Sequence, residues 1–139
     1  MSKITAAQVN ELRKKTGAGM MDCKKALVEA DGDMETAIDN LRKQGQKVAA
    51  KRQDRETTEG LVYAASAEGD KKGVLLVLGC ETDFVAKNDD FAKLTQSLLD
   101  IAVANKPANL DELKSLKFDD SLTVEEKITE QIGVIGEKL

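Results

Sequence analysis

The hydrophobic pattern of this 139-residue chain changes part-way along its length. Before residue 46, apolar side chains recur three or four positions apart, which is the spacing of amphipathic helices. After residue 60, two β-prone runs at 61–66 and 74–80 flank a polar, glycine-containing segment, which is typical of a β-hairpin. The polar stretch at 46–60 predicts either a linker or an extension of the preceding helix. We therefore expect an α+β fold built from two units.

Three short helices are expected in the first unit, residues 1–45. Thr5 begins a capping-box pattern that predicts the start of the first helix. Gly17 stands where a left-handed residue commonly ends a helix. A second and a third helix follow, separated by a break at 31–33, and the third is expected to end at Gly45.

The second unit, residues 61–139, combines the hairpin with helices. Because residues 74–78 form a nearly continuous apolar run, we expect the second strand to be buried on both faces. Apolar spacing predicts helices at 89–104 and 110–116. A second capping-box pattern, which begins at Thr123, predicts a last helix.

Composition excludes several classes of chemistry. The sequence contains no His, which removes the usual general base, most zinc sites and nucleophiles that His would activate. Aromatic residues make up only 3% of the chain, too few for a platform that stacks nucleic-acid bases. The two cysteines lack the spacing of zinc ligands, and the longest apolar run is far too short to span a bilayer. We therefore expect a cytoplasmic protein without membrane contact.

The net charge of −4 conceals an uneven distribution. Residues 1–55 carry twelve Lys and Arg against eight Asp and Glu, whereas residues 56–139 carry nine against seventeen. Because acids are interleaved with the bases of the first part, its charges predict a solvated helix surface rather than a nucleic-acid patch. The asymmetry favours two units with different surfaces.

The segment at 80–88, which joins the second strand to the long helix, carries Phe84. From the residues alone, we expect Phe84 to tuck beneath the helix as a hydrophobic staple, with Thr82 or Asp83 as a cap. The alternative is an exposed aromatic anchor beside a carboxylate, which is typical of hot spots in protein interfaces. The two readings predict opposite exposures for the ring.

Met20 and Met21 follow a glycine-rich turn and pose a similar question. The residues alone favour packing in the helical core, although only one of the two can face it well, and the other would lie on the surface or in a partner groove. Cys23 and Cys80 are expected to be buried free thiols, with a cysteine-dependent enzyme as a rival hypothesis.

Two longer segments together resemble a known family. Residues 16–27 read TGAGMMDCKKAL, and residues 82–87 read TDFVAK. Their order and separation are similar to those of the bacterial translation elongation factor Ts family, from about Ile4 to the end. Family members usually continue into a second core subdomain and a helical hairpin. The chain is therefore expected to correspond to the N-terminal portion of the family.

The resemblance also implies a fold and a function. It implies a three-helix module like a ubiquitin-associated domain at 1–45 and an incomplete core subdomain at 61–139. The implied function is guanine-nucleotide exchange on the translational GTPase elongation factor Tu, which the chain would meet in GDP-bound and nucleotide-free forms. Residues matching Arg13, Met20 and Met21 would dock on the partner's GTPase domain. The segment that would insert near the nucleotide and dislodge the partner's Mg²⁺ comprises Thr82, Asp83, Phe84 and Val85.

The ion and the nucleotide in this scheme belong to the partner. The chain itself is therefore expected to be no enzyme, to need no cofactor or metal, to carry no catalytic residue and to make no direct contact with nucleic acid. The alternative from another class is a free-standing protein-binding module, similar to a ubiquitin-associated domain, without exchange activity. The three-helix part alone permits that alternative, and the TDFVAK segment disfavours it.

Overall fold

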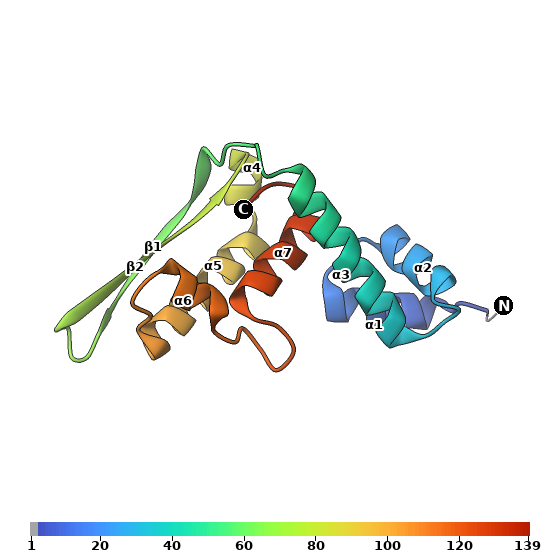
Figure 1. The fold of residues 1–139 in the computed structure, drawn as a ribbon, viewed down its shortest axis with the longest axis horizontal. Coiled ribbons are helices and arrows are strands. Elements are labelled where there is room, and N and C mark those ends of the chain that lie inside the picture. The colour runs from blue at the N-terminus through green and yellow to red at the C-terminus, as the bar shows by residue number, and fades with distance from the viewer. Residues whose placement is uncertain (1–2) are drawn as a thin grey trace. The chain divides into compact units, whose positions relative to one another are not determined.

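The computed structural model describes residues 3–139, which form helices and one antiparallel sheet (Figure 1). In chain order, these residues form three helices, a hairpin and four further helices. This arrangement confirms the α+β fold class. The chain divides into two compact units. The first contains the residues up to Lys51 together with Thr129–Gly136, and the second contains Arg52–Ile128 together with Glu137–Leu139.

Helices α1 (Ala6–Thr16), α2 (Met20–Glu29) and α3 (Met34–Lys51) belong to the first unit. The expected capping box is present, because the Gln8 N–H donates to Thr5 Oγ1 at 3.3 Å and the Thr5 N–H donates to Gln8 Oε1 at 2.9 Å. Gly17 has a φ of +72°, and its N–H donates to the Arg13 carbonyl at 2.8 Å. Since side chains disfavour that left-handed conformation, glycine is the residue suited to end α1.

A small apolar core holds these helices together. Leu12 and Leu27 are fully inaccessible and are its largest members. Burying one such side chain contributes about 1.5–3 kcal/mol, so each of these two leucines makes a large contribution to the hydrophobic stabilisation of the unit. The buried residues of the core are Val9, Leu12, Ala18, Cys23, Ala26, Leu27 and Ala37.

The third helix continues into the polar stretch at 46–60, for which a helical extension was one of the two expectations, and it ends at Lys51. The expectation that Gly45 ends it is wrong, because α3 continues to Lys51 with Gly45 buried inside it. A Cβ atom built on Gly45 would lie 3.4 Å from the carbonyl oxygen of Thr129, which belongs to α7 (Val124–Ile135). Gly45 therefore allows two helix backbones to approach each other, and this role overrides its tendency to end a helix.

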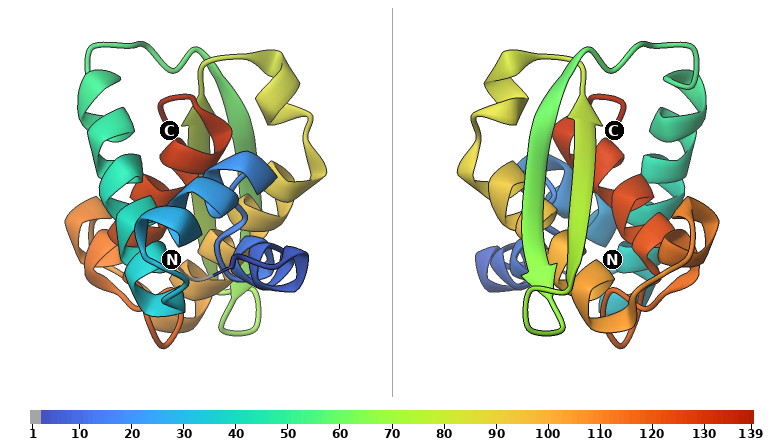
Figure 2. Two further views of the ribbon diagram at one scale, coloured as in Figure 1. Left: turned by 90° about the vertical axis from the view of Figure 1, so that its right-hand side faces the viewer. Right: turned by 90° about the vertical axis from the view of Figure 1, so that its left-hand side faces the viewer.

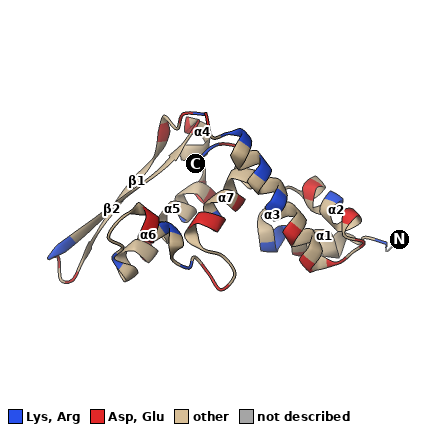
Figure 3. Cartoon of the chain, in the orientation of Figure 1, with Lys and Arg blue, Asp and Glu red and all other residues tan. Residues whose placement is uncertain are grey.

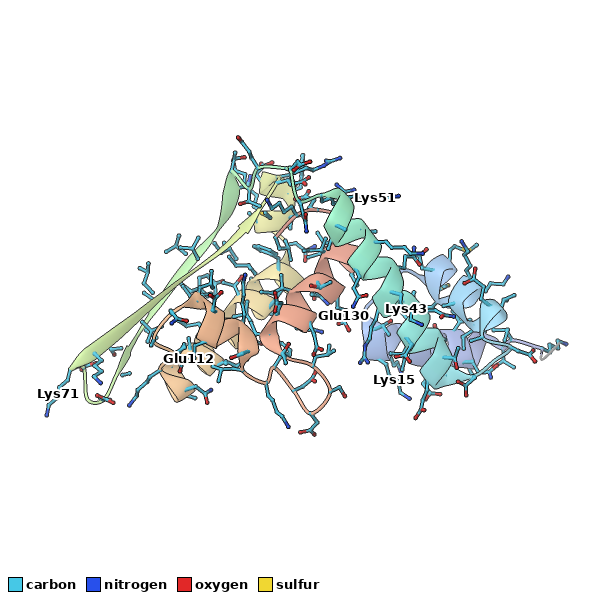
Figure 4. All side chains as sticks on the ribbon, in the orientation of Figure 1. Lys15, Lys43, Lys51, Lys71, Glu112 and Glu130 are labelled. Atoms are coloured by element: carbon cyan, nitrogen blue, oxygen red, sulfur yellow. The ribbon has the colours of Figure 1, made fainter. Side chains whose placement is uncertain are left out.

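The second unit contains a long hairpin formed by β1 (Glu59–Ala67) and β2 (Lys72–Cys80). The strands pair antiparallel with Leu61 opposite Leu78 and Ala67 opposite Lys72. Lys71 lies at the tip of the hairpin, where its side chain extends away from the strands (Figure 4). The hairpin expected from the two β-prone runs is therefore present, and each strand is slightly longer than its run.

Strand β2 is buried on one face only, so the expectation of burial on both faces is wrong. Leu76 and Leu78 are buried, whereas Leu75 and Val77 are 69% and 62% exposed. Helix α5 (Asp89–Asn105) packs against both strands and covers one side of the sheet. In the right-hand view of Figure 2, no other segment of this unit lies in front of the hairpin. The apolar run therefore has one covered face and one open face.

The remaining helices of the chain are short or begin in the second unit. They are α4 (Asp83–Ala86), α6 (Leu110–Ser115) and α7. Glu112, labelled in Figure 4, closes the cap of α6 by accepting the Ala108 N–H at 3.1 Å. The expected capping box of α7 is also present, with the Glu126 N–H donating to Thr123 Oγ1 at 3.2 Å.

Charged residues of both signs are distributed over the helices (Figure 3). Helix α3 carries Arg42, Lys43, Lys47 and Lys51, but also the acids Glu35 and Asp39. This interleaving agrees with a solvated surface rather than a continuous basic patch. None of the helices formed by residues 3–139 combines the length and the apolar character that crossing a lipid bilayer requires.

Candidate functional site

The TDFV segment forms a single exposed turn of helix between β2 and α5. Thr82 is the N-cap of α4, and its Oγ1 accepts the N–H of Val85 at 3.4 Å. Asn88 then caps α5, because its Oδ1 accepts the N–H of Asp90 at 2.8 Å. Two caps within seven residues explain why the chain passes from strand to turn to helix at this place.

Phe84 is 82% exposed, although large apolar side chains of a folded domain are usually buried. The staple expectation is therefore wrong, and the alternative of an exposed aromatic holds. The physical reason is the orientation of α4: its Val85 and Ala86 are half-buried, while its Asp83 and Phe84 are exposed. The buried aromatic of this region is instead Phe91, in the first turn of α5, at 2% exposure.

Asp83 shares the exposed side of α4 with Phe84. Its Oδ2 lies 3.1 Å from the Nζ of Lys87, one helical turn further on. The hydrogen bond from Lys87, together with its positive charge, lowers the pKa of the Asp83 carboxyl. The turn therefore presents an aromatic ring next to a carboxylate that stays ionised at neutral pH.

The base of this turn is held by a residue from the far end of the chain. Glu137 Oε1 accepts the backbone N–H groups of Glu81 and Thr82, each at 3.0 Å. Glu137 Oε2 accepts the hydroxyl of Thr82 at 2.6 Å. Sequence reasoning missed Glu137, because no motif connects it with a segment 55 residues earlier.

A second exposed group lies in the first unit. Met20 and Met21 are 52% and 75% exposed, so the expectation that one of them packs in the core is wrong. They open α2 directly after the turn that begins at Gly17, and the core positions of α2 are taken by Cys23, Ala26 and Leu27. Arg13 is also exposed, in the last turn of α1.

Both cysteines are buried free thiols, as expected. Burial raises the pKa of Cys23, and burial together with the charge of Glu137 raises the pKa of Cys80. The Cys80 thiol donates to the carbonyl of Thr82 at 3.2 Å. A raised pKa and a lack of access are the opposite of what a nucleophilic cysteine needs, so the cysteine-dependent hypothesis finds no support here.

The described residues also contain an apolar pocket of about 510 Å³ in the second unit, lined by parts of β2, α5 and α6. Its titratable lining residues are the lysines Lys72, Lys106 and Lys114. Glu68, which is not part of the lining, forms ion pairs with Lys72, at 3.3 Å, and with Lys106. Within residues 3–139, no group of three or more Cys, Asp or Glu side chains is arranged to hold a metal ion. Among the described residues, the charged side chains that line the pocket are all lysines.

Comparisons with known proteins agree with the resemblance. A sequence model of the family described as Elongation factor TS matches residues 81–139. The whole chain is 58% identical to elongation factor Ts of Christiangramia forsetii, of which it covers 50%. It is 54% identical to the protein of that name from Amoebophilus asiaticus over 98% of this chain and 49% of that protein.

The protein of the same name from Cytophaga hutchinsonii is 52% identical over the whole chain, which again covers 50% of the relative. The chain thus spans about half the length of the curated relatives it matches.

Proposed function

The chain resembles elongation factor Ts over its whole length, and from this premise we propose that it promotes the release of GDP from the translational GTPase elongation factor Tu. In this proposal the chain is an exchange factor and not an enzyme. The nucleotide and its Mg²⁺ are bound by the partner, so the chain itself holds no cofactor. The setting is the cytoplasm, without direct contact with nucleic acid or membrane.

The observation that carries the proposal is the exposure of Phe84. Leaving a phenyl ring in water forgoes about 1.5–3 kcal/mol that burial would provide. A partner that opens a gap for the ring recovers this free energy only in the opened state. Insertion of the TDFV segment between elements of the GTPase would therefore favour the conformation that binds nucleotide weakly.

The energetics of exchange require such a differential interaction. A nucleotide bound with a nanomolar Kd is held by about 12 kcal/mol. With an association rate constant of roughly 10⁶ M⁻¹s⁻¹ it would leave at about 10⁻³ s⁻¹, which is slow for repeated use. By linkage, a factor that binds the nucleotide-free partner more tightly weakens nucleotide binding by the same ratio.

Asp83 supports the same role through its charge. Its carboxylate lies beside the ring on the exposed side of α4 and forms an ion pair with Lys87 across the surface of the turn. When Phe84 inserts, Asp83 would enter the partner with it. A carboxylate brought close to a metal site competes for, or repels, the groups that organise the ion. We propose that this displacement of Mg²⁺ accompanies the release of GDP.

A second group of residues would dock on the GTPase and would not displace its Mg²⁺. This group comprises Arg13, Met20 and Met21. Methionine side chains adapt to irregular apolar surfaces, and an exposed Arg pairs readily with acids of a partner. The three residues flank one short turn in the first unit, so a single surface of the GTPase domain could contact them all. Their contribution is expected in affinity and not in the maximal rate of release.

The test is the release of a fluorescent GDP from purified elongation factor Tu with and without this chain. Phe84→Ala is expected to lower the maximal stimulated rate by about tenfold, which corresponds to about 1.4 kcal/mol of lost insertion energy. Because the ring is 82% exposed, the variant should unfold at nearly the temperature of the parent.

Leu110→Ala is a matched control, because it removes an exposed apolar side chain from α6, away from the TDFV turn. The control should release GDP at the parental rate. An unchanged rate with folded Phe84→Ala would refute the insertion mechanism. A parent chain that binds the GTPase without accelerating release would favour a binding module instead.

A further inference from the structure

The TDFV turn is too short to hold its own shape. Helix α4 has four residues, none of which is fully buried. A single turn of helix is unfavourable in isolation, because several residues are ordered for very few hydrogen bonds. The direction in which Phe84 points must therefore be determined by bonds that reach the turn from outside.

Glu137 supplies three such bonds from one carboxylate. The two consecutive N–H groups of Glu81 and Thr82 converge on Oε1, and the Thr82 hydroxyl donates to Oε2. Consecutive backbone N–H groups form a concavity suited to an anion. Hydrogen bonds to an ionised acceptor are roughly twice as strong as bonds between neutral groups, so this contact is a strong one.

The hydroxyl of Thr82 connects the Glu137 carboxylate to helix α4 through hydrogen bonds. Because it donates to Glu137, its oxygen lone pairs are directed toward the N–H of Val85, which it accepts at 3.4 Å. The carboxylate thereby fixes the rotamer of the residue that caps α4. Glu137, Thr82 and Val85 form one continuous chain of hydrogen bonds that ends next to Phe84.

The segment that carries Glu137 is itself anchored by the next residue, Lys138. The Lys138 N–H donates to Glu81 Oε1 at 3.2 Å, and Glu81 Oε2 pairs with Arg55 Nη1 at 3.3 Å. The Nζ of Lys138 donates to the carbonyls of Gln53 and Arg55 at 2.7 and 2.9 Å. Glu137 therefore projects from a braced backbone, which makes it a fixed support and not a mobile surface acid.

We infer that Glu137 is a positioning residue for nucleotide exchange: its carboxylate orients the Thr82 cap so that Phe84 is presented ready for insertion. This inference rests on the proposed function, because it assigns the way in which the TDFV turn is made rigid. A ring that is already oriented loses less conformational freedom when it binds, so more of its burial energy is available to open the partner.

Glu137→Ala is expected to lower the maximal rate of GDP release from elongation factor Tu by about tenfold, as the loss of a charged hydrogen-bonding partner would. The concentration of factor that gives half of the maximal rate should change much less. Glu137→Gln keeps an acceptor for the two N–H groups and should restore part of the rate. Glu125→Ala, at an exposed acid on the first turn of α7, is the control and should behave as the parent does.

A double variant separates positioning from a loss of fold. If Glu137 acts through Phe84, then Glu137→Ala combined with Phe84→Ala should be hardly slower than Phe84→Ala alone. Effects that multiply fully would overturn the inference, because they would show that the two residues act independently. If Glu137→Ala does not fold, Thr82→Val breaks the same chain of hydrogen bonds and takes its place in the cycle.

A measurement on the free chain distinguishes this inference from the proposed function. Amide hydrogen exchange at Thr82 and Val85 should be faster in Glu137→Ala than in the parent, whatever the chain binds. Unchanged protection at both amides would overturn the positioning role. If Phe84→Ala slows GDP release while Glu137→Ala does not, the inference is refuted and the exchange function stands.

Discussion

The structural roles of single residues in and around the TDFV turn differ in how well the sequence predicts them. Thr82 as a cap follows from its type and place, because its hydroxyl can satisfy the N–H of a residue three positions later. The exposure of Phe84 does not follow, since the same spacing also permits a staple under α5. Glu137 carries no local signal at all, because its partners lie 55 and 56 residues earlier.

The charge of Asp83 gives a prediction at this scale. Its pKa is lowered by the hydrogen bond and charge of Lys87, so the pair stabilises the fold above the pKa of the unfolded state. That contribution is lost as the pH falls through the lower, folded-state pKa. Lys87→Met should therefore raise the pKa of Asp83 toward the ordinary value of 3.8, as measured by NMR titration of its side-chain carboxyl carbon.

The exposed Lys93 on α5 provides the control for that titration. Lys93→Met should leave the pKa of Asp83 where it is in the parent. An equal pKa in the parent and in Lys87→Met would contradict the assigned cause.

The two buried thiols give a second prediction for single residues. Burial raises the pKa values of Cys23 and Cys80, so little thiolate exists and reagents cannot reach it. Alkylation by iodoacetamide at pH 8 should be slower by about tenfold or more in the folded chain than in urea. Rapid labelling of either thiol in the folded chain would instead restore the hypothesis of a reactive cysteine.

Among the elements, helix starts were predicted well and helix ends less well. Capping boxes at Thr5 and Thr123 are local patterns, and both are confirmed. The predicted helix end at Gly45 was wrong because the packing partner of this glycine, around Thr129, lies 84 residues further along the chain. The predicted burial of both faces of β2 was wrong for a related reason, because an apolar run cannot show whether one layer or two will cover it.

The close approach of α3 and α7 gives a prediction for a pair of elements. A Cβ on Gly133 would lie only 2.6 Å from the Gly45 Cα, a backbone atom that cannot turn aside. Gly133→Ala should therefore cost about 1–3 kcal/mol of the free energy of unfolding, reduced by the roughly 1 kcal/mol that alanine gains in a helix. Urea denaturation measures the net loss.

Gly45→Ala is the matched comparison, because its Cβ would meet the nearest atom at 3.4 Å, where a small adjustment suffices. The gain in helix propensity, about 1 kcal/mol, should offset the cost of this adjustment. The net change in the free energy of unfolding should therefore be close to zero. Equal losses in the free energy of unfolding for Gly133→Ala and Gly45→Ala would contradict the close approach described for this helix crossing.

For the molecule as a whole, the two candidate sites fall in different compact units. Arg13, Met20 and Met21 belong to the first unit, and the TDFV turn with its Glu137 support belongs to the second. The division of charge near residue 55 follows almost the same boundary, which lies at Lys51 and Arg52. Each unit thus has its own core, its own exposed apolar residues and its own balance of charge.

This division predicts that docking and displacement can be altered separately. Met20→Ala with Met21→Ala should raise the concentration of factor that gives half-maximal GDP release, by about tenfold for the two exposed side chains, and leave the maximal rate close to that of the parent. Phe84→Ala should instead lower the maximal rate and leave the half-maximal concentration close to that of the parent. Because the two sites belong to different compact units, their free-energy changes should add in the combined variant. Fluorescent GDP release over a range of factor concentrations measures both quantities, and a methionine variant that lowers only the maximal rate would show that α2 takes part in displacement itself.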